Sequence, residues 1–172
     1  MAFCFTQKIA VFVETAVHLF CFASKNVENI RRGIAAKMWA VSTKSGPTGR
    51  GRATKAKRYF ASGAHGLLYC RETHSFTTPF IATSGADPYT IVKDIWPEPW
   101  VLPFSIDPLG DLSRQLSGDL AKELWPILKN CGVGGVTAAM NAAGVTVFVP
   151  LPISDSDWAL ILDSLAVPSA TI

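Results

Sequence analysis

Residues 24–58 read SKNVENIRRGIAAKMWAVSTKSGPTGRGRATKAKR, and they carry the densest set of local signals in the chain. Asn26 is a residue that helices favour at the N-cap. Apolar side chains then recur every three or four residues, at Val27, Ile30, Ile34 and Met38. This spacing predicts an amphipathic helix that stops just before Trp39. One large aromatic side chain therefore stands between a short helix and a cationic segment, an arrangement that suits a binding site.

The chain changes character again after this helix. Residues 39–43, WAVST, have the composition of a strand start. Residues 44–58 combine six Lys and Arg side chains with Gly46, Pro47, Gly49 and Gly51. The glycines and the proline predict a loop, which ends in a short helix near residues 53–60.

The remaining elements follow from runs of apolar residues. Strands are expected at residues 9–13, 17–23, 65–72, 75–85, 91–110 and 145–151. In the fourth of these Pro79 argues for an edge or a bulge, and prolines break residues 91–110, which should wrap a surface. Helical spacing predicts helices at residues 112–128 and 154–166, whereas residues 131–144 fit a loop or a helix. The order of elements predicts an α+β fold, with a small mixed sheet or open barrel and helices packed outside.

Charge is distributed unevenly along the 172 residues. Residues 1–71 hold 12 Lys and Arg against two Asp and Glu, and residues 72–172 hold four against 11. Such asymmetry suggests a cationic face that meets a polyanion, and a solvated basic loop is the alternative. With 49% hydrophobic residues, the chain has material for a sizeable core.

The N-terminal residues and the cysteines bear on location. Glu14 and His18 interrupt the apolar N-terminal stretch, so we expect neither a signal peptide nor a membrane helix. We expect residues 1–16 to be an N-terminal extension that contains a strand. The four cysteines form no CxxC pair and match no zinc spacing. Buried, reduced thiols and a cytoplasmic location are expected.

The sequence contains no recognisable catalytic set. It has no HExxH, GxSxG or P-loop motif, and its acids are scattered. We therefore expect that the protein is not an enzyme and that it binds no metal or cofactor. Aromatic residues beside turns offer material for a binding module, because stacking of a base on such a ring contributes about 1–3 kcal/mol. They are Trp39, Tyr69, Phe76, Tyr89, Trp96 and Trp100. Core packing is the alternative for each tryptophan.

Residues 22–42, FASKNVENIRRGIAAKMWAVS, resemble the start of the YTH domain. Ser24 falls on the serine of that family's first turn, Glu28 and Asn29 on its helix opening, and Trp39 on the first tryptophan of its aromatic cage. Residues 66–82 look like the next two strands, with Phe76 on the family's phenylalanine. Residues 95–109, IWPEPWVLPFSIDPL, look more like the related EVE domain. Both domains belong to the PUA-like superfamily, and the resemblance covers about residues 17–151.

The resemblance implies one PUA-like domain over residues 17–172, a small mixed β-barrel or sheet with surrounding helices. It implies a reader of nucleic acid, DNA or RNA, that holds a methylated base flipped into an aromatic cage, where the methyl group leaves water. The base pocket implied consists of Trp39, Ser24, Lys25, Asn26, Tyr69, Phe76, Trp96 and Trp100. The phosphate-binding residues implied are Arg50, Arg52, Lys55, Lys57 and Arg58.

Several positions depart from the family pattern. Ala23 stands where the family has a turn lysine, Lys25 where it has a turn asparagine, and Lys37 where it has a glycine. The second cage tryptophan has no clear counterpart, and the candidates for it are Trp96, Trp100, Tyr89 and Tyr69. A preference for N6-methyladenine, as in YTH domains, and one for modified cytosine, as implied by EVE domains, both stay open.

Two other classes of function are kept beside the reader. One is a small nucleic-acid-processing enzyme or hydrolase, and the other is a protein-interaction domain with a solvated basic loop. The resemblance to EVE domains also implies a role as the specificity domain of a larger, modification-dependent restriction assembly.

Overall fold

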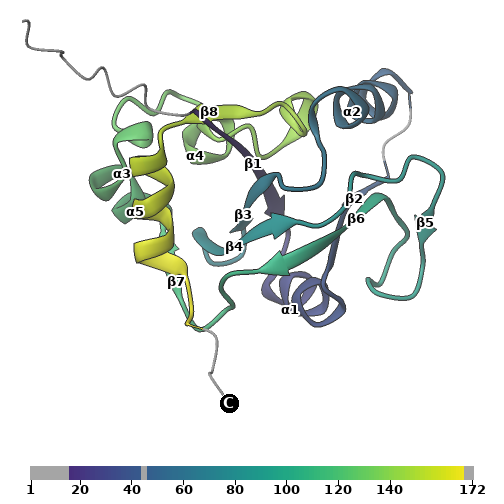
Figure 1. Ribbon diagram of the computed structural model, residues 1–172, viewed down its shortest axis with the longest axis horizontal. Coiled ribbons are helices and arrows are strands. Elements are labelled where there is room, and N and C mark those ends of the chain that lie inside the picture. Colours follow the sequence, from purple (N-terminus) through teal and green to yellow (C-terminus); the bar gives the residue numbers. More distant parts are fainter. Residues whose placement is uncertain (1–15, 44–45, 169–172) are drawn as a thin grey trace, which may run out of the picture.

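One mixed β-sheet organises the molecule, and the computed structural model describes it over residues 16–43 and 46–168 (Figure 1). The hydrogen-bonded strand order is β2-β6-β4-β3-β1-β8, with β5 paired to β6 and β7 to β4. The sheet is an open path with β2 and β8 at its two ends. The strands are β1 (Val17–Ser24), β2 (Met38–Ser42), β3 (His65–Cys70), β4 (Ser75–Ala82), β5 (Ile91–Val92), β6 (Trp100–Pro108), β7 (Gln115–Ser117) and β8 (Leu151–Ile153).

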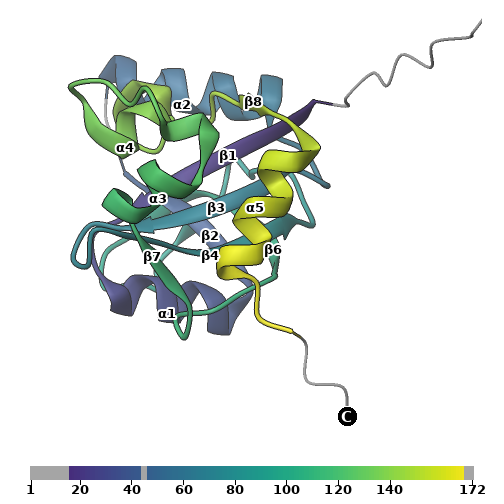
Figure 2. The same cartoon turned by 90° about the vertical axis from the view of Figure 1, so that its left-hand side faces the viewer.

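Helices cover both faces of this sheet. They are α1 (Val27–Ala36), α2 (Gly46–Tyr59), α3 (Gly118–Leu124), α4 (Gly135–Ala139) and α5 (Asp155–Leu165), with 3-10 turns η1 (Pro126–Leu128) and η2 (Gly144–Thr146). α1 and α2 pack into one hydrophobic core, and α3, α4 and α5 pack into a second core (Figures 1 and 2). The predicted α+β class is confirmed. None of the helices in the described residues is long and apolar enough to cross a membrane.

Strand β1 lies between the two cores, which explains its continuous apolar run. Phe20 and Phe22 belong to the core beneath α1 and α2, while Leu19 and Cys21 belong to the other core. Side chains of successive strand residues point to opposite faces, so a strand covered on both sides needs apolar residues at nearly every position. β1 pairs in parallel with β3, from Leu19↔His65 to Ser24↔Cys70.

Helix α1 begins as the sequence predicts and ends slightly earlier, at Ala36, so that Met38 belongs to β2. The side chain of Asn26 accepts a hydrogen bond from the backbone of Asn29, which confirms the predicted cap. The carboxylate of Glu72 also accepts a hydrogen bond from the Val27 amide at 2.9 Å. At the other end Lys37 adopts the left-handed conformation, with φ of 50°. That conformation favours glycine, because a side chain carries a steric cost there.

Helix α2 is longer than predicted. It begins at Gly46, so most of the segment expected to be a loop is helical. Pro47 lies in the first turn, where a missing amide hydrogen breaks no helical bond. Arg52 and Ala56, four residues apart, form the buried side of the helix. Packing against the sheet therefore outweighs the poor helix propensity of the glycines.

Three predicted elements differ in the structure. Residues 112–128 form β7, α3 and η1 instead of one helix, because residues 115–117 pair with β4. Ser117 then caps α3, and its hydroxyl oxygen accepts a hydrogen bond from the Leu120 amide. The strand expected at 145–151 does not form: residues 144–146 belong to η2, Phe148 has φ of 68° and cannot continue an extended chain, and β8 begins only at Leu151. Within residues 91–110 only β5 and β6 pair.

Other expectations hold. The predicted bulge near Pro79 is confirmed, because Thr78, with φ of 48°, is the extra residue opposite β3. Helix α5 begins with a capping box between Ser154 and Asp157. The strand predicted at residues 9–13 lies outside the described residues, and the extent of a single domain over 17–172 stays a prediction.

Replacing Lys37 by glycine should stabilise the protein. Glycine adopts the left-handed conformation without the steric cost that a side chain carries, so we expect the free energy of unfolding to rise by about 1 kcal/mol. The same change at Lys57, an exposed residue of α2, should lower it by about 1 kcal/mol because glycine weakens helices. Urea unfolding of the two variants measures both effects, and a loss of stability in Lys37→Gly would contradict the assignment.

Candidate nucleotide-binding pocket

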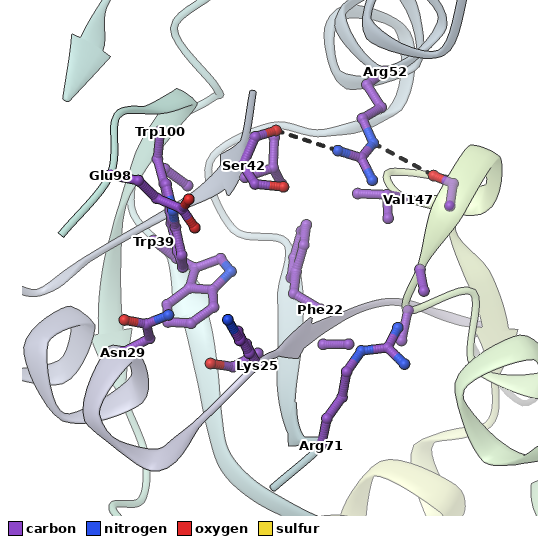
Figure 3. Close-up of a pocket in the computed structure, with 17 residues that line it drawn as sticks. Phe22, Lys25, Asn29, Trp39, Ser42, Arg52, Arg71, Glu98, Trp100 and Val147 are labelled. Carbon is purple, nitrogen blue, oxygen red and sulfur yellow. Dashed lines mark hydrogen bonds between the residues drawn. The ribbon is translucent and has the colours of Figure 1, made fainter. Parts of the chain in front are cut away.

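A pocket of about 330 Å³ opens where β1 ends (Figure 3). The end of β1, strand β2, the buried side of α2 and the connection between α4 and η2 form its walls. The apolar lining comes mainly from Phe22, Trp39, Val41, Trp100 and Val147. The polar side chains that line it are Ser24, Lys25, Asn29, Ser42, Arg52, Arg71 and Glu98.

Three tryptophans form one wall and the packing behind it. Trp96 and Trp100 stack on each other, with ring centroids 4.2 Å apart and planes 12° apart. Trp39 meets both edge-on, at 5.8 and 5.3 Å. The Trp96 Nε1 group donates a hydrogen bond to the Asn29 carbonyl at 3.0 Å, which ties this cluster to α1.

Trp39 is a core residue as much as a pocket residue. Only 1% of its surface is exposed, and Gly33 of α1 lies against its ring, where an added Cβ would be 2.7 Å from Cε3. Figure 3 shows the nitrogen edge of the Trp39 indole turned toward the pocket. In this arrangement Trp39 offers an N–H donor to a ligand instead of an open ring face for stacking.

Arg52 reaches the pocket from the buried side of α2. Its guanidinium donates to the carbonyls of Ser42 and Gly144, each at 3.4 Å, and so bridges two walls (Figure 3). The side chain is 7% exposed, and no carboxylate among the described residues pairs with it. Burial lowers the pKa of the Arg52 guanidinium, because the charged form loses water. A buried cation that lacks an acidic partner makes this pocket a favourable place for an anion.

Lys25 and Arg71 meet at the same edge of the sheet. They directly follow β1 and β3, and the Arg71 amide donates to the Ser24 carbonyl at 2.9 Å. Parallel strands end at a common edge, so the residues after them are neighbours. Arg71 was not among the residues predicted from sequence. Arg71 could have been predicted from the end of its strand at Cys70 only if the parallel pairing of this strand with the one that ends at Ser24 had been known.

The structure separates the other predicted pocket residues. Tyr69 and Phe76 lie in the second core, on the face of the sheet away from the pocket. Asn26 serves as the cap of α1, and Trp96 packs behind Trp100. None of these four side chains lines the pocket, whereas Trp39, Ser24, Lys25 and Trp100 do.

The predicted phosphate-binding residues are also divided. Arg52 alone of the five lines the pocket. Lys55 donates to the Val145 carbonyl, and the Arg58 guanidinium lies 5.1 Å from the centre of the Tyr59 ring. Arg50 and Lys57 are exposed on α2. Arg50, Lys57 and Arg58 therefore belong to the outer surface of the helix, whereas Lys55 is half-buried against η2.

The pocket residues missed by the sequence prediction include Arg71, Glu98, Asn29 and Ser42. Residues 142–144 also line the pocket although they come from the far end of the chain. Across residues 16–43 and 46–168, no group of three or more His, Cys, Asp or Glu side chains is placed to hold a metal ion.

Solved structures of similar fold include YTH domains. The YTH domain of the Zygosaccharomyces rouxii MRB1 protein, in complex with N6-methyladenosine RNA, superposes with a TM-score of 0.56 and 16% identity, over 89% of each chain. The Pho92 YTH domain in complex with m6A gives 0.54 and 12%, over 90% of this chain and 86% of that one. The YTH domain-containing protein mmi1 with RNA gives 0.52 and 11%, over 86% and 81%. No protein-family profile and no curated protein sequence matches the chain. The predicted resemblance to the YTH fold is confirmed.

The Arg52→Met variant should be as stable as the wild type or more stable. Methionine fills a similar volume without a buried charge, so we expect the free energy of unfolding to stay unchanged or to rise by about 1 kcal/mol. The control is Arg50→Met, an exposed position on the same helix, which should change it by less than about 0.5 kcal/mol. Thermal and urea unfolding measure the stability of both variants. If Arg52→Met lowered the free energy of unfolding by more than about 2 kcal/mol, the hydrogen bonds of Arg52 would be needed for stability, contrary to this prediction.

Proposed function

We propose that this chain is a reader domain that binds nucleic acid by holding one modified nucleotide in the pocket at the end of β1. The observation that supports this most is the combination of an indole N–H, two further aromatic rings and three cations around one small cavity. The same fold occurs in solved YTH domains bound to N6-methyladenosine RNA. No catalytic group is required for this role, and we propose a reader without catalysis.

The size of the pocket agrees with a single nucleotide. Ligand sites of about 300–1,000 Å³ hold small molecules, and a pocket of about 330 Å³ lies at the small end of that range. A base must leave its stack to enter such a site, which costs a few kcal/mol. Burying a methyl group against Phe22, Val41 or Val147 would return about 0.8 kcal/mol, and this gain favours the modified base.

The charges agree with a phosphate backbone beside the base. Lys25, Arg52 and Arg71 place three positive charges around the cavity, against the single carboxylate of Glu98. Contacts of Lys and Arg with phosphates provide affinity and position the strand without reading sequence. Arg50, Lys57 and Arg58 on the outer face of α2 would extend this cationic surface along the strand.

Finer assignments are part of the proposal. The YTH fold favours methylated RNA as the partner, and methylated DNA is the alternative. A cytoplasmic location is also proposed, on the free cysteines Cys21, Cys70 and Cys131. A place in a modification-dependent restriction assembly is proposed on the resemblance of residues 95–109 to EVE domains alone. The enzyme class has no supporting observation among the described residues.

A binding titration tests the proposal. Short single-stranded RNA and DNA oligonucleotides carrying an unmodified base, N6-methyladenine or 5-methylcytosine are titrated at fixed moderate salt, and then over a salt series. We expect one modified base to bind more tightly than its unmodified parent, and we expect log affinity to fall linearly with log salt. Equal binding of every oligonucleotide would contradict the proposal.

Arg71→Gln should weaken binding of every oligonucleotide and reduce the salt slope by about 1, because one phosphate contact is lost. Lys129→Gln, an exposed position away from the pocket, removes the same charge and should leave the slope unchanged. Equal salt slopes in the two variants would show that Arg71 does not contact a phosphate.

Trp39→Phe is preferable to Trp39→Ala as a probe of the pocket. Alanine would remove about 3–5 kcal/mol of core packing and confuse unfolding with loss of binding. Phenylalanine keeps an aromatic ring and removes the N–H donor, so we expect affinity to fall about tenfold in a protein that remains folded. Circular dichroism checks the fold, and full affinity in folded Trp39→Phe would show that the indole N–H does not contact the ligand.

A further inference from the structure

The segment Trp96-Pro97-Glu98-Pro99-Trp100 holds an acidic side chain at the pocket in a rigid frame. The rings of Trp96 and Trp100 stack on each other and close the segment, and Trp96 is hydrogen-bonded to α1 through the Asn29 carbonyl. Pro97 and Pro99 flank Glu98, and each proline fixes its own φ angle. The backbone on both sides of Glu98 is therefore restricted before any ligand arrives.

The Glu98 carboxylate is an unused hydrogen-bond acceptor. It lines the pocket and is exposed, and it forms no ion pair with the described cations although Lys25, Arg52 and Arg71 line the same cavity. No hydrogen bond to it occurs among the described residues either. A carboxylate in this state offers lone pairs to N–H donors of a ligand.

The pocket is electrically asymmetric. Figure 3 shows Glu98 with Trp39 and Trp100 on one side, both guanidiniums, of Arg52 and Arg71, on the other side, and Lys25 below Trp39. This distribution favours one orientation of a bound nucleotide, because its phosphate is attracted by the two guanidiniums and repelled by the carboxylate. The base then lies on the side of Glu98, toward which the nitrogen edge of the Trp39 indole also opens.

We infer that Glu98 is a specificity-determining residue that accepts a hydrogen bond from the exocyclic amino group of the bound base. This inference rests on the proposed function and deepens it. Adenine and cytosine carry such an amino group, N6–H or N4–H, next to a ring nitrogen that accepts from a donor such as the Trp39 N–H. Guanine also carries an amino group. Uracil, thymine and hypoxanthine present a carbonyl oxygen at the corresponding position.

A carbonyl in place of the amino group should be rejected. Two acceptors would face each other, and the carboxylate would lose water without gaining a donor. The same argument applies to modified bases. N6-methyladenine keeps one N–H and 5-methylcytosine keeps two, so both remain compatible with Glu98, while 5-methyluracil does not. The pocket therefore reads the amino group independently of the methyl group.

Matched pairs of oligonucleotides test the inference. One pair carries N6-methyladenine or 6-methoxypurine, which replaces the N–H by oxygen and keeps the methyl group. The other pair carries 5-methylcytosine or 5-methyluracil, which differ at the amino group and at the neighbouring ring nitrogen. For the base that the pocket accepts, the wild type should prefer the amino member by about 10- to 100-fold.

Glu98→Gln should reduce this ratio to about threefold or less, because an amide can rotate to donate to a carbonyl or accept from an amine. The variant also loses a negative charge, which raises affinity for both members of a pair, so the ratio is the informative quantity. The control is Asp94→Asn, which removes the same charge from the same loop at a residue that does not line the pocket. It should leave the ratio unchanged.

The outcomes separate the inference from the function beneath it. Modification-dependent binding with a wild-type ratio near 1, or with a ratio that Glu98→Gln leaves unchanged, would overturn the role of Glu98 alone. Absence of any modification-dependent binding in the wild type would overturn the proposed function and the role of Glu98 together. A binding ratio that falls in Glu98→Gln and is retained in Asp94→Asn would establish the role of Glu98.

Discussion

The parallel pairing of β1 with β3 is the constraint on which the site depends. The two strands run together from Leu19↔His65 to Ser24↔Cys70 and are covered by a core on each face. Parallel strands end at a common edge, so the chain leaves both at the same place and brings Lys25 and Arg71 to one cavity. Burial on both faces makes a change of register costly, because a slip by one residue would exchange the side chains of the two cores. The position of two pocket cations is therefore a consequence of sheet stability.

The turn that follows β1 is held from several directions. Asn26 caps α1 from within the turn, and Glu72 caps the same helix from the turn between β3 and β4. The Ser24 hydroxyl donates to the Asn26 carbonyl at 2.9 Å, so the turn also closes on itself. Side chains on such a fixed backbone lose little further freedom when a ligand binds. The hydrogen bonds that begin helix α1 also preorganise this edge of the pocket.

Packing and recognition share the same residues on the tryptophan side of the pocket. Trp39 is almost fully buried between α1, Trp96 and Trp100, and only the edge of its ring meets the cavity. Trp100 lines the cavity too, and its buried Nε1 has no hydrogen-bond partner in the described part of the chain. A ring that is fixed by its neighbours presents its donor in one direction. Selectivity at this wall comes from the rigidity of the core behind it, and changes to the wall alter stability as well as binding.

Local patterns in the sequence determined the elements whose signals are local. The apolar run of β1, the cap and period of α1, the bulge near Pro79 and the capping box of α5 were all predictable, because neighbouring residues decide them. The resemblance of residues 22–42 also predicted Trp39 and Ser24 as pocket residues, and both line the pocket. Helix α2 was underestimated because the burial of Arg52 and Ala56 against the sheet outweighs its glycines. The partition of residues 112–128 depends on pairing with β4, which lies about 40 residues earlier in the sequence.

The membership of the site was decided by the tertiary structure. Tyr69 belongs to β3, the strand that leads into Arg71, yet its side chain faces the second core. Side chains alternate along a strand, but the sequence alone does not say which set faces which side of the sheet. Arg71, Glu98 and residues 142–144 come from three separate parts of the chain. They meet because β1 pairs with β3, because β2 pairs with β6, which follows Glu98, and because the connection after α4 is hydrogen-bonded to the end of β1. Local sequence patterns were enough to predict β1, β3, β4, the capped helix α1 and the basic character of the N-terminal half. Only the long-range pairing of strands decided which of the charged and aromatic side chains share a cavity, because that choice depends on contacts between residues far apart in the chain.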